Sequence, residues 1–450
     1  MSLIVLLSPK AGSPASSCLK PARRSQAGIV EIMPPSPPVR HLTLDALRGI
    51  AVMGILAMNI IAFSMPQPAY INPLAWGGTS AADLGMWAVN FILVDGKMRG
   101  LFSLLFGASM LLVIDGAEAK GLSGGFIHAR RMLWLMIFGL IHLYLIWYGD
   151  ILFLYAVVGL IAYGFSHKDA PALLRLGIGL ILTSFVFWAI MGVALIFMQH
   201  GAMAADASAG QIASYRGMIA SIGAPDTAPI HHEIEIYRGS YTQILANSLA
   251  PDNIDAPLTT LLLTGLETLG LMLIGMALLR NGFLTGQWSR SQYRSVAIRA
   301  YLCGLPPMIA LCLWCLASGF DPVTTFNAVL VWSTPFRIIM VIAHAALALS
   351  IILARPQSRL LRRIAAAGRV AFTNYLGTSI AMTALFYGYG LGLFGHVSRF
   401  HVYGFVLIGW AVMLWWSKPW LERFAYGPLE WLWRSLARGK IQSMRRTAPN

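Results

Sequence analysis

The chain has 450 residues, of which 57% are hydrophobic and 11% charged, and its net charge is +15. A soluble domain carries about a quarter charged residues, so this composition, with a mean hydropathy of +0.67, excludes an ordinary soluble protein. The basic residues lie between long apolar segments and form no separate basic domain. We therefore interpret the positive charge as a membrane topology signal, and we expect no nucleic-acid partner.

The first part of the chain differs from the rest. Residues 1–40 are rich in Pro, Ser and Ala, which predicts a disordered N-terminal extension. The apolar run 3–7 is shorter than the roughly 7–15 residues of a signal-peptide core. Met1 and Met33 remain alternative translation starts.

Apolar segments of about 18–25 residues predict transmembrane helices, and together they predict an all-α, multi-pass integral membrane bundle of about ten helices in a domain spanning 41–420. The predicted spans are 44–65, 98–114, 132–148, 151–166, 174–198, 256–279, 298–319, 331–354, 370–393 and 401–418. Residues 81–94 are interpreted as an interfacial or re-entrant helix, because a full span there would move Arg130 and Arg131 to the outside.

Lys and Arg cluster in alternate connections between these spans, for example in 115–131, 280–299 and 355–369. Because basic connections stay in the cytoplasm, this pattern predicts that both termini are cytoplasmic and that the loop 199–254 is outside. Residues 421–450 alternate Trp with Lys and Arg, which indicates a cytoplasmic amphipathic tail at the bilayer surface.

The first span carries three polar candidates for substrate binding. Asp45 and Arg48 are three residues apart and can form an ion pair, and Asn59 returns to nearly the same helix face. One interpretation is a structural ion pair with an Arg that reaches the membrane surface. The other is a site for an anionic cytoplasmic ligand, with Arg48 facing a cavity.

The end of the third span carries the catalytic candidates, His142 and Asp150. Asp150 precedes the next helix, where a carboxylate caps the N-terminus, and a neutral His142 could simply bond a neighbouring backbone group. If catalytic, His142 would act as a general base oriented by Asp150, since its pKa lies near the operating pH. We expect His142 to face a polar cavity shared with Lys97 or Arg337.

Four further charged residues complete the predicted substrate-binding set: Lys97, Arg99, Glu267 and Arg337. Glu267 is central in its span and must be protonated or paired, with Arg337 as a candidate partner. Lys97, Arg99 and Arg337 together would form an outer basic pocket. The alternative is three separate contacts with lipid headgroups.

Several ordered motifs carry a resemblance to a known family. They are LDALRGIAVMGILAMN at 44–59, DGKMRGLFSLLFGASM at 95–110, HLYLIWYGDILFLYAVVGLI at 142–161, GRVAFTNYLGTS at 368–379 and GPLEWLWR at 427–434. The chain resembles the YeiB-like family of bacterial membrane proteins, known as domain-of-unknown-function family 418. That family is similar to transmembrane acyltransferases, which move an acyl group from cytosolic acyl-CoA to a sugar across the membrane. No His follows Arg48 on the first or second span, where the acyltransferase-three relatives carry one.

The resemblance implies an acyltransferase of the bacterial inner membrane, with acyl-CoA as donor and an envelope glycan or lipid-linked sugar as acceptor. The bilayer itself is the other expected partner, and no metal is expected. The rival hypothesis is a non-enzymatic transporter or permease in which Glu267, His142 and Arg337 bind a small solute and protons. Substrate, acyl chain and oligomeric state stay open.

Overall fold

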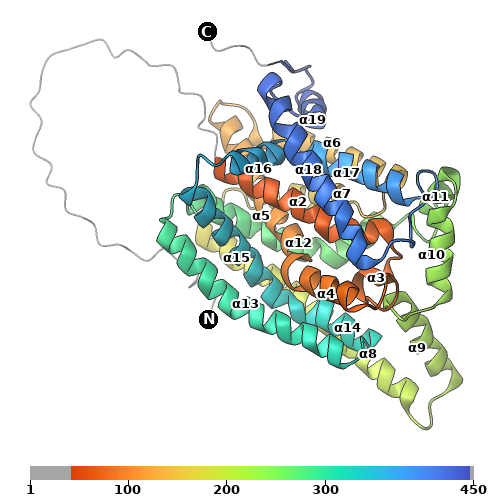
Figure 1. Ribbon diagram of the computed structural model, residues 1–450. Coiled ribbons are helices and arrows are strands. Elements are labelled where there is room, and N and C mark those ends of the chain that lie inside the picture. Colours follow the sequence, from red (N-terminus) through yellow and green to blue (C-terminus); the bar gives the residue numbers. More distant parts are fainter. Residues whose placement is uncertain (1–41, 446–450) are drawn as a thin grey trace, which may run out of the picture.

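The computed structural model describes residues 42–445, and in that range the chain is an assembly of helices without a β-sheet (Figure 1). One isolated bridge joins Phe424 and Arg445. The all-α prediction is therefore confirmed. The extension 1–40, which was expected to be disordered, lies outside the described residues.

Eight helical segments within residues 42–445 are long and apolar enough to cross a membrane. They are α2 (Leu42–Ser64), α4 (Ala81–Val89) with η1 (Asn90–Val94) and α5 (Lys97–Glu118), α6 (Gly124–Leu145), α8 (Ala170–Met203), α12 (Ala256–Arg280), α13 (Arg290–Ala317), α14 (Pro322–Phe326) with η2 (Asn327–Trp332) and α15 (Ser333–Ala354), and α18 (Arg399–Arg423).

Two predicted spans form shorter helices. The segments 151–166 and 370–393 contain α7 (Leu152–Tyr163) and α17 (Ala371–Phe386), of 12 and 16 residues. At 1.5 Å per residue they are about 18 and 24 Å long, less than the roughly 30 Å of a bilayer core. All ten predicted segments are thus helical, and eight have spanning length. The turn that precedes α7 and the glycine-rich segment that follows α17 contain apolar residues that are not helical.

The helix ends alternate between two ends of the bundle. At one end, which we call the basic end, Arg280 donates to the Ser166 carbonyl and Trp433 to the Arg131 carbonyl. At the opposite end, the Tyr241 hydroxyl donates to the Leu145 carbonyl. The short helices α9 (Ala209–Ile222), α10 (Ala228–Arg238) and α11 (Tyr241–Ser248) lie together away from the basic end (Figure 1). This arrangement agrees with the alternation that the basic residues predict.

The segment 81–94 forms α4 and the π-helix η1, and a break at Gly96, whose φ is +68°, separates it from α5. Trp87 donates from its indole to the Ile71 carbonyl, and the Phe400 amide donates to Asp83. These contacts hold α4 at the opposite end, beside α3 (Pro68–Ile71) and the start of α18.

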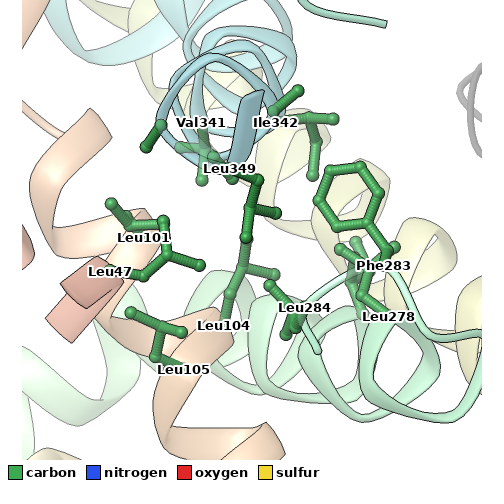
Figure 2. Close-up of a cluster of buried hydrophobic side chains, with 14 of the residues drawn as sticks. Leu47, Leu101, Leu104, Leu105, Leu278, Phe283, Leu284, Val341, Ile342 and Leu349 are labelled. Atoms are coloured by element: carbon green, nitrogen blue, oxygen red, sulfur yellow. The ribbon is translucent and has the colours of Figure 1, made fainter. Parts of the chain in front are cut away.

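A large buried apolar cluster lies between α2, α5, α12, α13 and α15 (Figure 2). Leu47, Leu101 and Leu349 point toward one another there and are fully buried. Since lipid is as apolar as these side chains, such contacts stabilise the bundle through close packing more than through the hydrophobic effect.

One of the closest helix approaches is that of α16 (Arg359–Arg369) to α2. A Cβ atom on Gly368 would lie 1.9 Å from the Asp45 carbonyl oxygen, and one on Gly49 would lie 2.0 Å from that of Ile364. Small residues at both positions therefore permit backbone contact between the two helices.

We expect Gly368→Ala to lower the free energy of unfolding by about 1–3 kcal/mol, because the added methyl group forces α16 away from α2. The measurement is the melting temperature of the purified protein in detergent. Gly116→Ala in α5 is the matched control, since a Cβ atom there meets nothing within 4 Å. Equal melting temperatures for the two variants would contradict the packing argument.

A carboxylate joins α10 to the bundle. Both oxygens of the half-buried Glu233 accept from the Gln67 backbone amide, at 2.9 and 3.0 Å. Burial raises the pKa of Glu233 from 4.5 to about 7, although the hydrogen bond from Gln67 acts in the opposite direction. The Glu233 carboxyl therefore binds a proton more tightly when α10 is packed on the bundle than when α10 is detached. The stability of this contact falls as the pH rises from the unfolded to the folded pKa.

We expect backbone amides of α10 to exchange hydrogen faster at about pH 8 than at about pH 5, after correction for the intrinsic rates. Glu233→Gln should remove this difference, because the amide oxygen still accepts from Gln67 and does not titrate. Glu235→Gln, at an exposed neighbouring position, should keep it. An unchanged pH effect in Glu233→Gln would show that another group is responsible.

Candidate functional site

A cavity of about 300 Å³ opens at the basic end, between α2, α5, α6, α7, α16, α17 and α19 (Pro428–Arg438). We call it the arginine cavity, because its lining contains four arginines: Arg48, Arg131, Arg369 and Arg434. The remaining lining is mostly apolar and includes Phe102, Leu105, Phe106, Met132, Leu135 and Leu152. The cavity thus combines positive charge with an apolar interior.

Arg48 fulfils both interpretations of the sequence, since it forms an ion pair and also lines a cavity. Its guanidinium pairs with Asp45 at 2.9 Å and donates to the Ser109 hydroxyl at 2.6 Å. The side chain also lines the arginine cavity and is 24% exposed. The predicted ion pair is therefore present, and it holds Arg48 at the cavity.

The C-terminal tail is packed on the bundle through α19. Trp433 lies 4.3 Å from the Arg131 guanidinium and donates to the Arg131 carbonyl. Glu430 accepts from the backbone amides of Phe372 and Thr373, at 2.8 and 3.1 Å. A carboxylate at a helix N-terminus is stabilised by the helix dipole. Through these contacts α19 forms one wall of the arginine cavity.

His142 and Asp150 meet directly. His142 Nδ1 lies 2.8 Å from Asp150 Oδ1, and both side chains are fully buried. The contact forms because α6 ends at Leu145 and the chain turns before α7 begins. The second oxygen of Asp150 accepts from the Phe153 amide at 2.8 Å, which is the predicted capping role. Nε2 of His142 is buried and has no hydrogen-bond partner within residues 42–445.

Tyr375 separates this pair from the arginine cavity. Its side chain lines the cavity, and its ring centroid lies 5.2 Å from that of His142. On the other side, Tyr375 borders a void of about 10 Å³ that Asn59 also lines. Arg48 and Asn59, expected on one polar stripe, therefore line different cavities, and Tyr375 borders both.

Glu267 is held between two arginines. Arg99 donates to Glu267 Oε1 at 2.8 Å, and Arg337 donates to Oε2 at 2.6 Å. The predicted pairing of Glu267 with Arg337 is confirmed. The interpretation of Arg99 and Arg337 as headgroup contacts is wrong, because both guanidiniums reach inward to one buried carboxylate. We call these three residues the charged triad.

Lys97 does not join the charged triad. It is 1% exposed, and its ammonium donates to the Phe91 carbonyl at 2.5 Å. The outer basic pocket expected from Lys97, Arg99 and Arg337 is thus replaced by an interior cluster in which two of these cations pair with one carboxylate. We also expected His142 to share a polar cavity with Lys97 or Arg337. Among the described residues His142 contacts neither of them, and its side chain faces Asp150 and aromatic rings.

Sequence reasoning missed several residues that line the arginine cavity. Arg131 was assigned only to the topology signal and Arg434 only to the amphipathic tail, and Tyr375 lay unremarked within the GRVAFTNYLGTS motif. Tyr155 also lines the cavity, and its hydroxyl lies 2.9 Å from that of Ser103. Tyr155, Tyr375 and Arg434 each lie within a motif that carries the family resemblance, and this was the one signal of their importance, whereas Arg131 lies in none of these motifs.

Residues 278–440 match the family model described as "Protein of unknown function (DUF418)". The uncharacterized protein YeiB of Escherichia coli K12 is 34% identical over 409 residues, which cover 88% of this chain and 96% of YeiB. The chain belongs to the YeiB-like DUF418 family. The uncharacterized protein YxaH of Bacillus subtilis 168 is 30% identical over 404 residues, covering 87% of this chain and 92% of YxaH. No solved structure gives a significant match.

The family model covers the part of the chain from the end of α12 to α19, which includes Arg337, Tyr375 and Glu430. The two bacterial relatives match 88% and 87% of this chain, so the similarity extends over earlier helices as well, including α6 with His142. Together with the eight helices of spanning length, these matches identify a multi-pass membrane protein of the DUF418 family.

We expect Glu267→Gln to lower the free energy of unfolding by about 3–5 kcal/mol, because it leaves two buried guanidiniums without a counter-charge. The measurement is thermal or denaturant unfolding in detergent. Asp252→Asn, in the exposed loop before α12, makes a similar change without this effect. A Glu267→Gln protein as stable as the parent would contradict the role assigned to the charged triad.

Proposed function

We propose that this protein is a membrane acyltransferase that uses acyl-CoA as donor and an envelope glycan or lipid-linked sugar as acceptor. The observation that carries the proposal is the arginine cavity, which is apolar inside and ends against Tyr375, directly beside the His142–Asp150 pair. In this proposal the basic end faces the cytoplasm, as expected from the positions of Lys and Arg.

The arginine cavity suits a donor with a phosphorylated head and an apolar tail. Guanidinium groups bind phosphate oxygens through two parallel hydrogen bonds, so Arg48, Arg131 and Arg434 are suited to the head. Phe102 and Phe106 offer apolar surface to the acyl chain. A volume of about 300 Å³ falls at the lower end of small-molecule sites, which favours a short acyl group.

The His142–Asp150 pair supplies the base for the transfer. In this proposal His142 Nδ1–H donates a hydrogen bond to Asp150, so Nε2 carries the lone pair. Nε2 takes the proton of an acceptor hydroxyl or amine as that group attacks the thioester carbonyl. The carbon–sulfur bond then breaks, and the leaving thiolate takes the proton back from Nε2. Because Tyr375 covers His142, its side chain must move aside before the donor can reach the base.

The charged triad argues against the alternative of a solute transporter. A transporter built on Glu267, His142 and Arg337 needs these groups in one accessible site. Here Glu267 is neutralised by two arginines, and the arginine cavity is lined by neither Glu267 nor Arg337.

The proposal is tested with purified protein in nanodiscs, labelled acyl-CoA and an extract of envelope glycans and lipids. Arg48→Gln should weaken acyl-CoA binding about 10- to 100-fold, the loss expected for one charge-assisted hydrogen bond. His142→Gln should retain binding and lose at least about 100-fold in transfer, because the general base is missing.

Two exposed positions provide controls. Arg216→Gln in α9 and His200→Gln at the end of α8 make the same chemical changes outside the site, and both should match the parent. Full transfer by His142→Gln would disprove the role of the base. Accumulation of a solute in proteoliposomes without a covalent product would establish transport instead.

A further inference from the structure

A second positively charged hollow lies at the basic end, outside the arginine cavity. Its volume is about 270 Å³, and it is lined by four residues, all of them basic: Arg359, Arg362, Arg363 and Lys418. Three of them come from α16 and the fourth from α18. None of them lines the arginine cavity, so this hollow, which we call the α16–α18 site, is a separate feature.

Its positive charge is only partly neutralised. Lys418 pairs with Glu422 one turn along α18, and Arg363 donates to the Leu414 carbonyl at 3.3 Å. Within residues 42–445 the structure shows no ion pair for Arg359 or Arg362. Like charges around one hollow repel one another, and an anion within it would remove that repulsion.

The orientation of α16 adds to this preference. The helix begins at Arg359, with Ser358 as its N-cap, so Arg359 and Arg362 lie in and next to its first turn. A helix N-terminus carries a partial positive charge and is normally complemented by acidic side chains. Basic residues at this end destabilise the helix in isolation. An anion bound beside them would be attracted both by the basic side chains and by the helix N-terminus.

An exposed apolar stripe on α18 leads to the same hollow. Ile408, Val412 and Trp415 are 63%, 51% and 72% exposed. Steps of four and three residues place them on one helix face, and a further step of three reaches Lys418. An acyl chain could therefore lie along this stripe while its phosphate reaches the four basic side chains.

We propose that the α16–α18 site binds an anionic phospholipid, with the phosphate among Arg359, Arg362, Arg363 and Lys418 and an acyl chain along α18. Basic pockets between transmembrane helices bind such headgroups, and each basic side chain near the bilayer surface adds to the affinity. Bound lipid would hold α16 and α18 together. Because α16 also contacts α2, the lipid would stabilise the basic end independently of any acyl transfer.

The test is native mass spectrometry of the full-length protein, titrated in detergent with phosphatidylglycerol or phosphatidylethanolamine. Phosphatidylglycerol should bind with clear preference. In Arg359→Gln/Arg362→Gln its binding should weaken roughly 30-fold, the effect of removing two basic side chains at a membrane surface. Arg290→Gln/Arg294→Gln removes two exposed charges at the start of α13 and should leave the preference unchanged.

Three results would overturn the proposal. Equal binding of the two lipids by the parent protein would exclude an anion-selective site, whatever the variants do. Equal weakening in both double variants would show a diffuse surface attraction. Displacement of phosphatidylglycerol by an equal concentration of inorganic phosphate would identify a soluble anion as the occupant and exclude the lipid.

Discussion

The charged triad is the constraint on which the rest of the bundle depends. A carboxylate in an apolar interior is costly unless it is neutralised, and Glu267 is neutralised from two sides. Its partners lie on different helices, so one carboxylate links α5, α12 and α15. The same three helices form most of the apolar cluster in Figure 2, where close packing excludes voids. The polar contact specifies which helices meet, and the packing stabilises the contact.

The candidate functional groups around the charged triad lie in separate places. The arginine cavity lies toward the basic end, and the His142–Asp150 pair lies beyond it, with Tyr375 between them. This separation has a physical consequence: an unpartnered Nε2 in an apolar enclosure is protected from water until the aromatic ring moves. The proposed transfer thus requires a change in one side chain of α17, a helix held at its start by Glu430.

The two helices that are too short to span the membrane, α7 and α17, adjoin irregular segments that make tertiary contacts. The residues before α7 form the turn that brings Asp150 back to His142, and those after α17 include Gly388, where a Cβ atom would lie 1.9 Å from the Arg238 carbonyl oxygen. A hydropathy profile counts both segments as spans because the flanking residues are apolar. The irregular backbone is tolerated because it is buried within protein and contributes its own hydrogen bonds.

The sequence by itself determined the helical class, the alternation of helix ends and the Asp45–Arg48 pair, because each depends on composition or on contacts within one helix. The pairing of Glu267 with Arg337 could also be foreseen, since a buried carboxylate requires a cation. Only the tertiary structure decided that Arg99 joins them, that Lys97 does not, and that Tyr375 covers His142. Those outcomes depend on which helices are neighbours and how they are rotated, and neither property can be read from the period of a single helix.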